Sequence, residues 1–368
     1  MPVSEADFVA AINAALATVV DPHTGQPYTA GRQLRNLKVE PGGAVSFDLE
    51  LGYPARSQHD IVAQALAQAA SAVDGVAAVQ ARVGSRITAH QVQRGVQLLP
   101  GVSNIIAVSS GKGGVGKSTT AVNLALALVA EGARAGLLDA DIYGPSLPMM
   151  MGLQGRPESA DGKTLEPLEN HGVQVMSIGL LVDAEQAVAW RGPMATQALD
   201  QLLRQTHWHD LDYLVVDMPP GTGDIQLTLA QRVPVTGAVI VTTPQDIALA
   251  DARKGLAMFQ KMNVPILGIV ENMAVHVCTN CGHVEHIFGA EGGKRMAAQY
   301  GVPYLGALPL SLAIREQTDS GRPTVVAEPD GEAARLYKAI ARQVAVEVAG
   351  KARDFSTKFP TIQVSKTS

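Results

Sequence analysis

A glycine-rich stretch, GKGGVGKST at residues 111–119, has the spacing of a loop that binds phosphate groups. It matches G-x-x-x-x-G-K-[ST], a pattern in which glycines let backbone N–H groups approach phosphate oxygens closely. An apolar run at 104–110 precedes it and a helical pattern at 119–132 follows, so the positive end of a helix would face the same phosphates. The sequence therefore predicts a nucleotide-binding P-loop rather than an empty glycine-rich turn.

The side chains of this loop indicate how the nucleotide is held. Lys117 is expected to reach the β- and γ-phosphates, and Ser118 is expected to bind magnesium. Lys112 lies outside the minimal pattern, so the residues alone leave it either as a functional lysine or as a solvated loop lysine. Nucleotide contacts are expected along the whole loop, from Gly111, Lys112, Gly113, Gly114, Val115, Gly116, Lys117, Ser118 and Thr119.

Three aspartates stand where two apolar runs end. Asp139 and Asp141 close ARAGLLDAD (133–141), and Asp217 closes DYLVVD (212–217). Phosphoryl transfer depends mainly on positioning and charge neutralisation, so Asp217 is expected to hold magnesium through water. Capping of the helices that follow the strands would explain one of these aspartates, but not three beside a P-loop.

The chain has two cysteines, Cys278 and Cys281, spaced as C-x-x-C in VCTNCGH. One pair supplies two thiolates, whereas a thiolate-only tetrahedral site or an iron–sulfur cluster usually takes four. A two-fold axis between two chains would supply the other two. The alternatives are a zinc site completed by His283 and His286, whose H-x-x-H spacing is shorter than usual, a dithiol redox pair, and an unliganded surface pair.

The composition indicates a globular protein of a reducing compartment. The 368 residues favour two domains, and 46% hydrophobic with only 4% aromatic residues predict an aliphatic core. The net charge of −5 gives no reason to expect nucleic acid. Two cysteines are too few for a disulfide framework. No apolar window reaches the roughly 18 residues that a membrane-spanning helix needs. Glu5 and Asp7 stand where a signal peptide would have basic residues. We therefore expect a cytoplasmic protein that binds neither nucleic acid nor a membrane.

Residues 1–88 have the pattern of a small α/β domain. Apolar residues have helical spacing in EADFVAAINAALATVV and in HDIVAQALAQAASAVDGV. AVSFDLELG alternates like a strand, and AAVQARV reads as a closing strand. Residues 89–102 are weakly patterned and are predicted to be a linker.

From residue 103 to 350 short apolar runs alternate with longer helical stretches. The runs do not alternate between apolar and polar residues, as expected for strands buried on both faces of a doubly wound, mostly parallel sheet. They lie at 104–110, 133–141, 212–220, 237–244, 264–272 and 302–309, and the last helix at 331–350. His207 and His209, in THWHD, are expected in a solvated loop rather than as ligands, and residues 351–368 are expected to be a disordered tail.

The loop resembles the deviant Walker A motif, G-K-G-G-x-G-K-[ST], of the class that includes the cell-division ATPase MinD, the partition ATPase ParA and the nitrogenase iron protein. The resemblance implies that Lys112 reaches across a dimer interface to the partner's nucleotide. It implies that Asp139 contributes to the magnesium shell and that Asp141 positions the attacking water. It also implies that Asn272, in IVENM, contacts adenine.

A longer set of motifs resembles the Mrp-type (ApbC-like) ATPases, which carry iron–sulfur clusters. The matching stretches occur in order over about 103–330: WRGPM, DMPPGTGD, TTPQDIALADARKG, GIVENM, CTNCGH and IFGAEGGKRMA. The resemblance implies a homodimer with a [4Fe–4S] cluster bridged by Cys278 and Cys281 of both chains. It implies slow, magnesium-dependent ATP hydrolysis coupled to transfer, a cluster donor, and apo iron–sulfur proteins as recipients.

The N-terminal region resembles the small domain that precedes such ATPases in bacteria and is associated with iron–sulfur assembly. That domain sometimes carries a cysteine near the segment LGYPARS (51–57), but this chain has none there, so an N-terminal cysteine ligand is excluded.

Two other functions fit parts of the sequence. A MinD-like regulator, switched by nucleotide, would end in a basic amphipathic helix, whereas this chain ends KFPTIQVSKTS, and a regulator would leave Cys278 and Cys281 unexplained. A nitrogenase-like reductase would take its cluster cysteines from separate loops rather than from one C-x-x-C.

Overall fold

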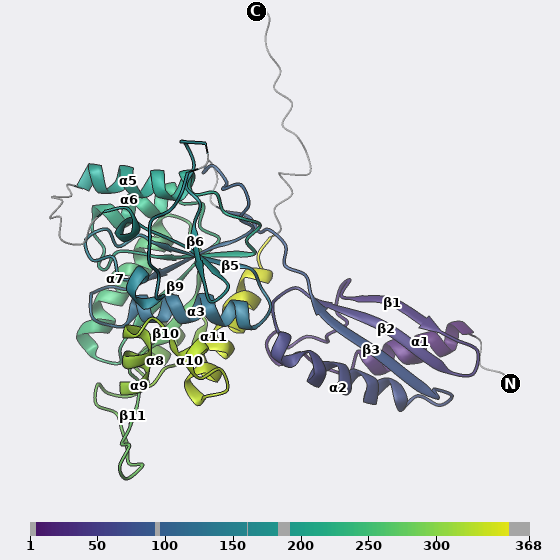
Figure 1. Ribbon diagram of the computed structural model, residues 1–368. Helices are drawn as coiled ribbons and strands as arrows, with labels where there is room; N and C mark the ends of the chain where they lie inside the picture. Colours follow the sequence, from purple (N-terminus) through teal and green to yellow (C-terminus); the bar gives the residue numbers. More distant parts are fainter. Residues whose placement is uncertain (1–4, 93–95, 160, 183–191, 353–368) are drawn as a thin grey trace, which may run out of the picture.

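The computed structural model describes residues 5–92, 96–159, 161–182 and 192–352. Two sheets lie in different parts of the chain, one on either side of the stretch 89–102 that was predicted to be a linker (Figure 1). The first has three strands and the second has eight. The boundaries that the sequence suggested for the domains stay a prediction, and 353–368 of the predicted tail lie outside the described residues.

The N-terminal unit packs two helices on one face of its sheet. Strand β2 pairs with β1 in antiparallel fashion and with β3 in parallel fashion. The alternation in β2 is confirmed, because Val45, Phe47, Leu49 and Leu51 are all buried. Strand β1 was not predicted, because LRNLKV leaves half of its residues exposed and shows no clean alternation. The elements are α1 (Glu5–Leu16), β1 (Leu34–Val39), β2 (Ala44–Leu51), η1 (Arg56–Gln58), α2 (His59–Ser71) and β3 (Ala78–Ser85).

The larger unit is the predicted doubly wound α/β fold. Its sheet has the order β13-β10-β9-β4-β8-β5-β7-β6, and every pair is parallel except β7 with the edge strand β6. The first elements are β4 (Ile105–Ser109), α3 (Lys117–Ala130), β5 (Ala135–Asp139), α4 (Leu147–Met150), β6 (Leu168–Asn170), β7 (Val173–Ser177) and η2 (Ile178–Leu180). Next come α5 (Gly192–Gln205), β8 (Tyr213–Asp217), α6 (Asp224–Arg232), β9 (Gly237–Thr242), α7 (Asp246–Lys261) and β10 (Ile266–Glu271). The last are β11 (His276–Val277), β12 (Val284–Glu285), α8 (Gly292–Tyr300), β13 (Tyr304–Ala307), α9 (Leu312–Asp319), α10 (Thr324–Ala327) and α11 (Glu332–Ala349).

Two aliphatic cores lie on the two faces of this sheet. Alternate residues of β4 belong to different cores. Ile106 and Val108 belong to the core beneath α3 and α11. Ile105 and Ala107 belong to the core beneath α5 and α7 (Figure 1). Strands β4, β5, β8, β9 and β10 are buried along their whole length. Burial on both faces explains why their sequences are apolar without alternation.

Hydrogen bonds from Ser57 to a buried carboxylate join the N-terminal unit to the helix that follows the P-loop. Glu131, at the end of α3, is 1% exposed. Its carboxylate accepts hydrogen bonds from Ser57 Oγ at 2.8 Å, from Ser57 N at 3.0 Å and from Arg342 Nη1 at 2.5 Å. One carboxylate therefore joins the start of α2, the end of α3 and the middle of α11.

We expect Glu131→Ala to lower the free energy of unfolding by about 3–5 kcal/mol, because the Arg342 charge is then left buried without its partner. Urea unfolding followed by circular dichroism measures this change. Arg315→Ala is the matched control, since it removes exposed ion pairs to Glu316 and Asp319 and is expected to change stability by less than about 1 kcal/mol. Equal losses in the two variants would contradict the role given to Glu131.

Candidate functional site

The predicted P-loop connects β4 to α3 and needs its glycines for two different reasons. Gly114 and Gly116 have φ of 79° and 80°, in the left-handed region that favours glycine. A Cβ at Gly111 would overlap the backbone of Asp251 in α7, and one at Gly116 would overlap the side chain of Asn272. At Gly113 and Gly114 no atom of the described residues lies within 4 Å of an added Cβ, so close packing does not explain these two glycines.

Lys117 is the first residue of α3 and contacts the carboxylate of Asp217 at the end of β8. Its Nζ lies 2.5 Å from Asp217 Oδ1 and 3.1 Å from Ser118 Oγ. Lys117 is 6% exposed and Asp217 is fully buried. The other oxygen, Asp217 Oδ2, is buried and has no hydrogen-bond partner among the residues that the structure describes. A buried carboxylate oxygen with spare acceptor capacity, beside a hydroxyl and an ammonium group, fits a magnesium ion with its water ligands.

Asp139 is buried at the end of β5 and holds the following loop in place. Its carboxylate accepts hydrogen bonds from the backbone N–H groups of Asp141, Ser146 and Leu147 and from Ser177 Oγ, at 3.0–3.2 Å. Burial, followed by the nearby Asp217, raises the pKa of Asp139 to about 7. The structure thus gives Asp139 a positioning role for the loop after β5, and its predicted contribution to the magnesium shell stays a prediction.

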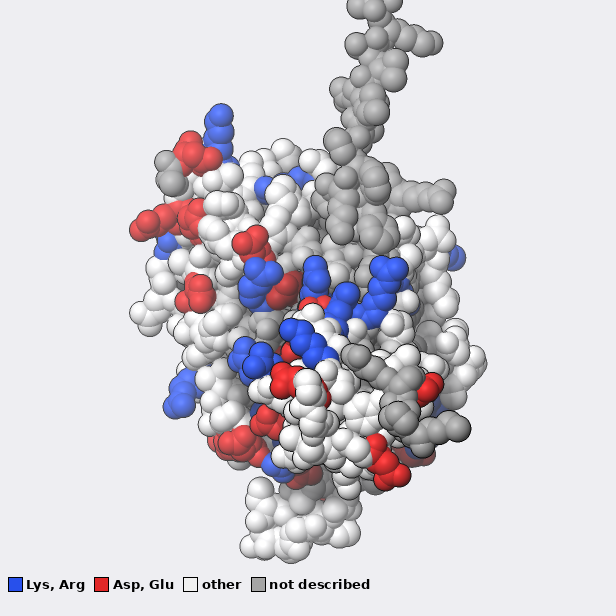
Figure 2. Space-filling model, turned by 90° about the vertical axis from the view of Figure 1, so that its right-hand side faces the viewer, with Lys and Arg blue, Asp and Glu red and all other residues white. Residues whose placement is uncertain are grey.

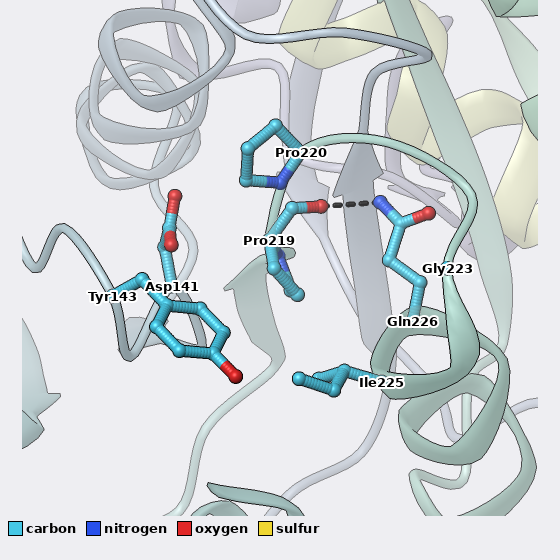
Figure 3. A pocket seen from close by; sticks show the side chains of 7 residues that line it. All are labelled: Asp141, Tyr143, Pro219, Pro220, Gly223, Ile225 and Gln226. Carbon is cyan, nitrogen blue, oxygen red and sulfur yellow. Dashed lines mark hydrogen bonds between the residues drawn. The ribbon is translucent and has the colours of Figure 1, made fainter. Parts of the chain in front are cut away.

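Asp141 lines a cavity of about 410 Å³ between the loop after β5 and the loop after β8 (Figure 3). The side chains of Asp141 and Tyr143 form one side, and Pro219, Pro220 and Ile225 face them from the other. Burial, more than the nearby Asp217, raises the pKa of Asp141 above its usual value. A carboxylate at the wall of a cavity, close to Lys117 and Asp217, has the location that a group positioning a water molecule needs.

Gln226 is a residue of this site that the sequence did not single out. It is 1% exposed, and its side-chain amide donates to the carbonyl oxygen of Pro219 and, at 3.3 Å, to Ser109 Oγ (Figure 3). These bonds join the loop after β8 to the end of β4. The sequence places Gln226 in the first turn of the helix after DMPPGTGD, but a glutamine is usually exposed, so its burial could not be predicted.

Lys112, the second residue of the P-loop, is partly exposed. Its carbonyl oxygen accepts a hydrogen bond from Ser110 Oγ at 2.9 Å. Within the described parts of the chain its ammonium group has no ion-pair or hydrogen-bond partner. This position leaves it available for a group outside its own subunit, and its action in trans stays a prediction.

Asn272 follows β10 and bonds directly to the P-loop. Its Nδ2 donates to the carbonyl oxygen of Val115 at 2.8 Å, across 157 positions of the chain. The preceding residue, Glu271, is buried and accepts a hydrogen bond from the N–H of Gly293 at the start of α8. The sequence did not predict either contact. The contact with adenine that was predicted for Asn272 stays a prediction.

Cys278 and Cys281 lie on a hairpin, β11–β12, that projects from the larger unit between these two anchored positions (Figure 1). Cys278 is partly exposed and Cys281 is exposed, and both are free thiols. The backbone N–H groups of Asn280 and Cys281 lower the pKa of the Cys278 thiol below its usual value. A lowered pKa favours the thiolate, which is the form that binds metal.

The surface of the hairpin is partly apolar, and Glu285, at the end of β12, is its one charged side chain. Its segment from Asn272 to Val284 contains no lysine, arginine, aspartate or glutamate, and Figure 2 shows the projecting lower end of the molecule without charged side chains. Val277, Val284 and Ile287 are large apolar residues that stay exposed on it. Such a surface is suited to contact another protein.

The two histidines of the alternative zinc site do not complete one with the cysteines. His286 Nδ1 bonds to the carbonyl oxygen of Ala274 at 2.9 Å, at the base of the hairpin, and His283 Nε2 lies 3.8 Å from Glu285. Within the described residues, three potential metal ligands converge at only one place, which is Glu166 with His207 and His209. The exposed loop expected for His207 and His209 is observed, but both side chains contact Glu166.

Comparison with known proteins decides the family. Residues 101–345 match the model of the NUBPL iron-transfer P-loop NTPases. The chain belongs to that family. Residues 9–83 match a separate model, described as an iron-sulfur cluster assembly protein. The predicted Mrp-type membership and P-loop NTPase fold are therefore confirmed.

The NUBPL-family assignment agrees with individual relatives. The chain is 59% identical to an iron-sulfur cluster carrier protein of Pseudomonas fragi over 75% of this chain and 97% of the other. It is 56% identical to the Escherichia coli K12 protein of the same name, over 75% of each chain. The mouse iron-sulfur cluster transfer protein NUBPL is 54% identical over 67% of this chain and 78% of its own.

Solved structures give the same fold for the NTPase part. A nucleotide-binding protein from Archaeoglobus fulgidus in complex with ADP, with cobalt found, is 36% identical, with a TM-score of 0.56 over 64% of this chain and 93% of that chain. The MinD ATPase of Pyrococcus furiosus is 24% identical, with a TM-score of 0.50 over 66% and 98%, a likeness that shows the fold alone. None of the described helices is both long and apolar enough to cross a membrane.

Proposed function

We propose that this protein is an ATP-dependent carrier that holds a [4Fe–4S] cluster between two copies of the chain and delivers it to apo iron–sulfur proteins. The observation that carries the proposal is the pair Cys278 and Cys281, accessible on a hairpin whose tip carries no charged residue. This hairpin follows Asn272, which bonds to the P-loop. Family membership supports the carrier function, since the relatives are named as cluster carriers or transfer proteins.

The thiolate count supports a dimer. One chain offers two cysteine sulfurs, and a [4Fe–4S] cluster takes four. A two-fold axis brings equivalent residues of two chains together, so two hairpins supply the full set. The exposed Val277, Val284 and Ile287 would be covered in the same contact. A MinD-like regulator that is switched by nucleotide would leave Cys278 and Cys281 without a function.

The residues of the NTPase site suggest how ATP is hydrolysed. Backbone N–H groups of the P-loop bind the phosphates, and Lys117 must release Asp217 to reach them. Asp217 and Ser118 are placed to hold magnesium, which neutralises charge on the phosphates when bound. Asp141 positions the attacking water from the cavity wall, and Lys112 of the other subunit completes the site. Hydrolysis is slow, because the dimer must form first.

One short segment provides the coupling between nucleotide and cluster. Asn272 bonds to the carbonyl oxygen of Val115, which lies inside the loop that closes on phosphate. Glu271 bonds to the N–H of Gly293, after the hairpin. A shift of the P-loop on nucleotide binding is thereby passed to both ends of the hairpin, which changes the exposure of the cluster to a recipient.

We expect anaerobic reconstitution to load about two iron atoms per chain, equivalent to one [4Fe–4S] cluster per dimer. Cys278→Ala and Cys281→Ala should each abolish loading, since either leaves only two thiolates in a dimer. Iron and sulfide analysis with absorption spectra measures the cluster, and size-exclusion chromatography measures the dimer. A loaded dimer should also pass its cluster to an apo-ferredoxin, faster with ATP.

His283→Gln and His286→Gln are the matched controls, because both histidines lie near the cysteines in the hairpin but are not proposed as ligands. Both variants should keep the iron content. One zinc per monomer, lost on either histidine change, would replace the carrier proposal with the mononuclear zinc site.

A further inference from the structure

Three side chains converge at the opposite edge of the large sheet from the cysteine hairpin. The hairpin follows β10, beside the edge strand β13, whereas Glu166 lies just before the other edge strand, β6. Glu166 Oε1 lies 2.9 Å from His207 Nδ1, and its Oε2 lies 2.7 Å from His209 Nε2. A ligand atom from each of the three residues lies within 4.8 Å of the others.

The backbone holds the two histidines in this arrangement independently of their side chains. His207 N donates to the carbonyl oxygen of Leu165 at 2.9 Å. His209 exchanges two hydrogen bonds with the side chain of Gln174 in β7, at 2.9 and 3.1 Å. Trp208 between them is 3% exposed and points into the core. Trp208 is therefore anchored in the core, whereas the histidines on either side of it are exposed and contact the same carboxylate.

The chemistry of this cluster selects one class of ion. Two imidazole nitrogens and one carboxylate oxygen are donors that suit Zn²⁺, Ni²⁺ and Fe²⁺, whereas Mg²⁺ and Ca²⁺ prefer oxygen ligands alone. Three protein ligands leave a coordination position for water. The side chains of Glu166, His207 and His209 are 40%, 58% and 51% exposed, so an ion can enter without opening the core.

We propose that Glu166, His207 and His209 form a metal site for one borderline divalent transition-metal ion, separate from the cysteine hairpin and from the magnesium site. The ion would replace the two histidine–carboxylate hydrogen bonds. It would connect the segment before β6 to the segment between α5 and β8. Binding to the folded chain alone stabilises the fold by mass action.

Zinc binding to the full-length Cys278→Ser/Cys281→Ser protein tests the site without competition from the thiols. Isothermal titration should give one Zn²⁺ per chain, with excess Mg²⁺ present, and the melting temperature should rise with zinc. Glu166→Gln, His207→Asn and His209→Asn should each weaken binding at least about tenfold and remove the rise in melting temperature. Three separate variants keep the test valid if one of them fails to fold.

The control is His283→Gln in the same background. His283 is an exposed histidine with a carboxylate neighbour, Glu285, but no third ligand converges there among the described residues. This variant should bind zinc as the parent does. Zinc binding that survives His207→Asn and His209→Asn together, or that is lost on His283→Gln, would overturn the proposal.

Discussion

Replacing Lys117 by methionine should reduce ATP turnover at least about a thousandfold, equivalent to about 4 kcal/mol of transition-state stabilisation. The ammonium group of this lysine is buried and lies 2.5 Å from the Asp217 carboxylate. Its loss removes charge neutralisation where phosphoryl transfer needs it. Steady-state phosphate release with and without magnesium measures the effect, and turnover should require magnesium.

Lys117→Met also leaves Asp217 buried without a partner, so the variant is expected to lose stability. Asp141→Asn tests the same site without that problem, because Asp141 lines the cavity rather than the core. It should bind nucleotide like the parent and hydrolyse it at least about a hundredfold more slowly. Full turnover in both variants would remove the ATPase assignment from this loop.

Lys112→Ala should leave nucleotide affinity within about tenfold, or roughly 1.4 kcal/mol, and yet abolish hydrolysis. The reason is that Lys112 is partly exposed, with no partner for its ammonium group within the described chain. Nucleotide binding is measured by fluorescence titration and hydrolysis by phosphate release. The control for Lys112→Ala is Lys254→Ala, which removes an exposed lysine of α7 that pairs with Asp251.

Mixing two inactive variants decides whether Lys112 acts on its own site or on the partner's. In a dimer of Lys112→Ala with Asp141→Ala, one site keeps its own Asp141 and receives the partner's Lys112. Random exchange of equal amounts makes half of the dimers mixed, so about a quarter of all sites should be competent. A mixture as inactive as its parents would mean that Lys112 does not cross the interface.

Features that depend only on neighbouring residues could be identified from the amino-acid sequence. The P-loop is nine consecutive residues between a strand and a helix, so its glycines and Lys117 could be identified without any knowledge of the fold. The same holds for C-x-x-C at Cys278 and Cys281. Buried parallel strands were also predictable, because burial on both faces requires uninterrupted apolar runs.

Weakly patterned strands were not predictable. β1 is half exposed, and β6, with three residues, and β7, with five, are short runs at the edge of the large sheet. β1 and β6 pair with the longer strands β2 and β7, and β7 pairs with β5. This pairing makes them strands, because β-propensity depends on the neighbouring strands as well as on a strand's own residues.

Contacts between distant side chains could be found only in the folded chain. Lys117 lies 100 positions from Asp217, Asn272 lies 157 from Val115, and Glu131 lies 211 from Arg342. The same is true of Glu166, which no sequence motif singled out and which meets His207 and His209 at the edge of the sheet. The order of the strands in the sheet determines these contacts, and no local pattern contains that order, because the free energy that selects it comes from burying two whole faces of the sheet.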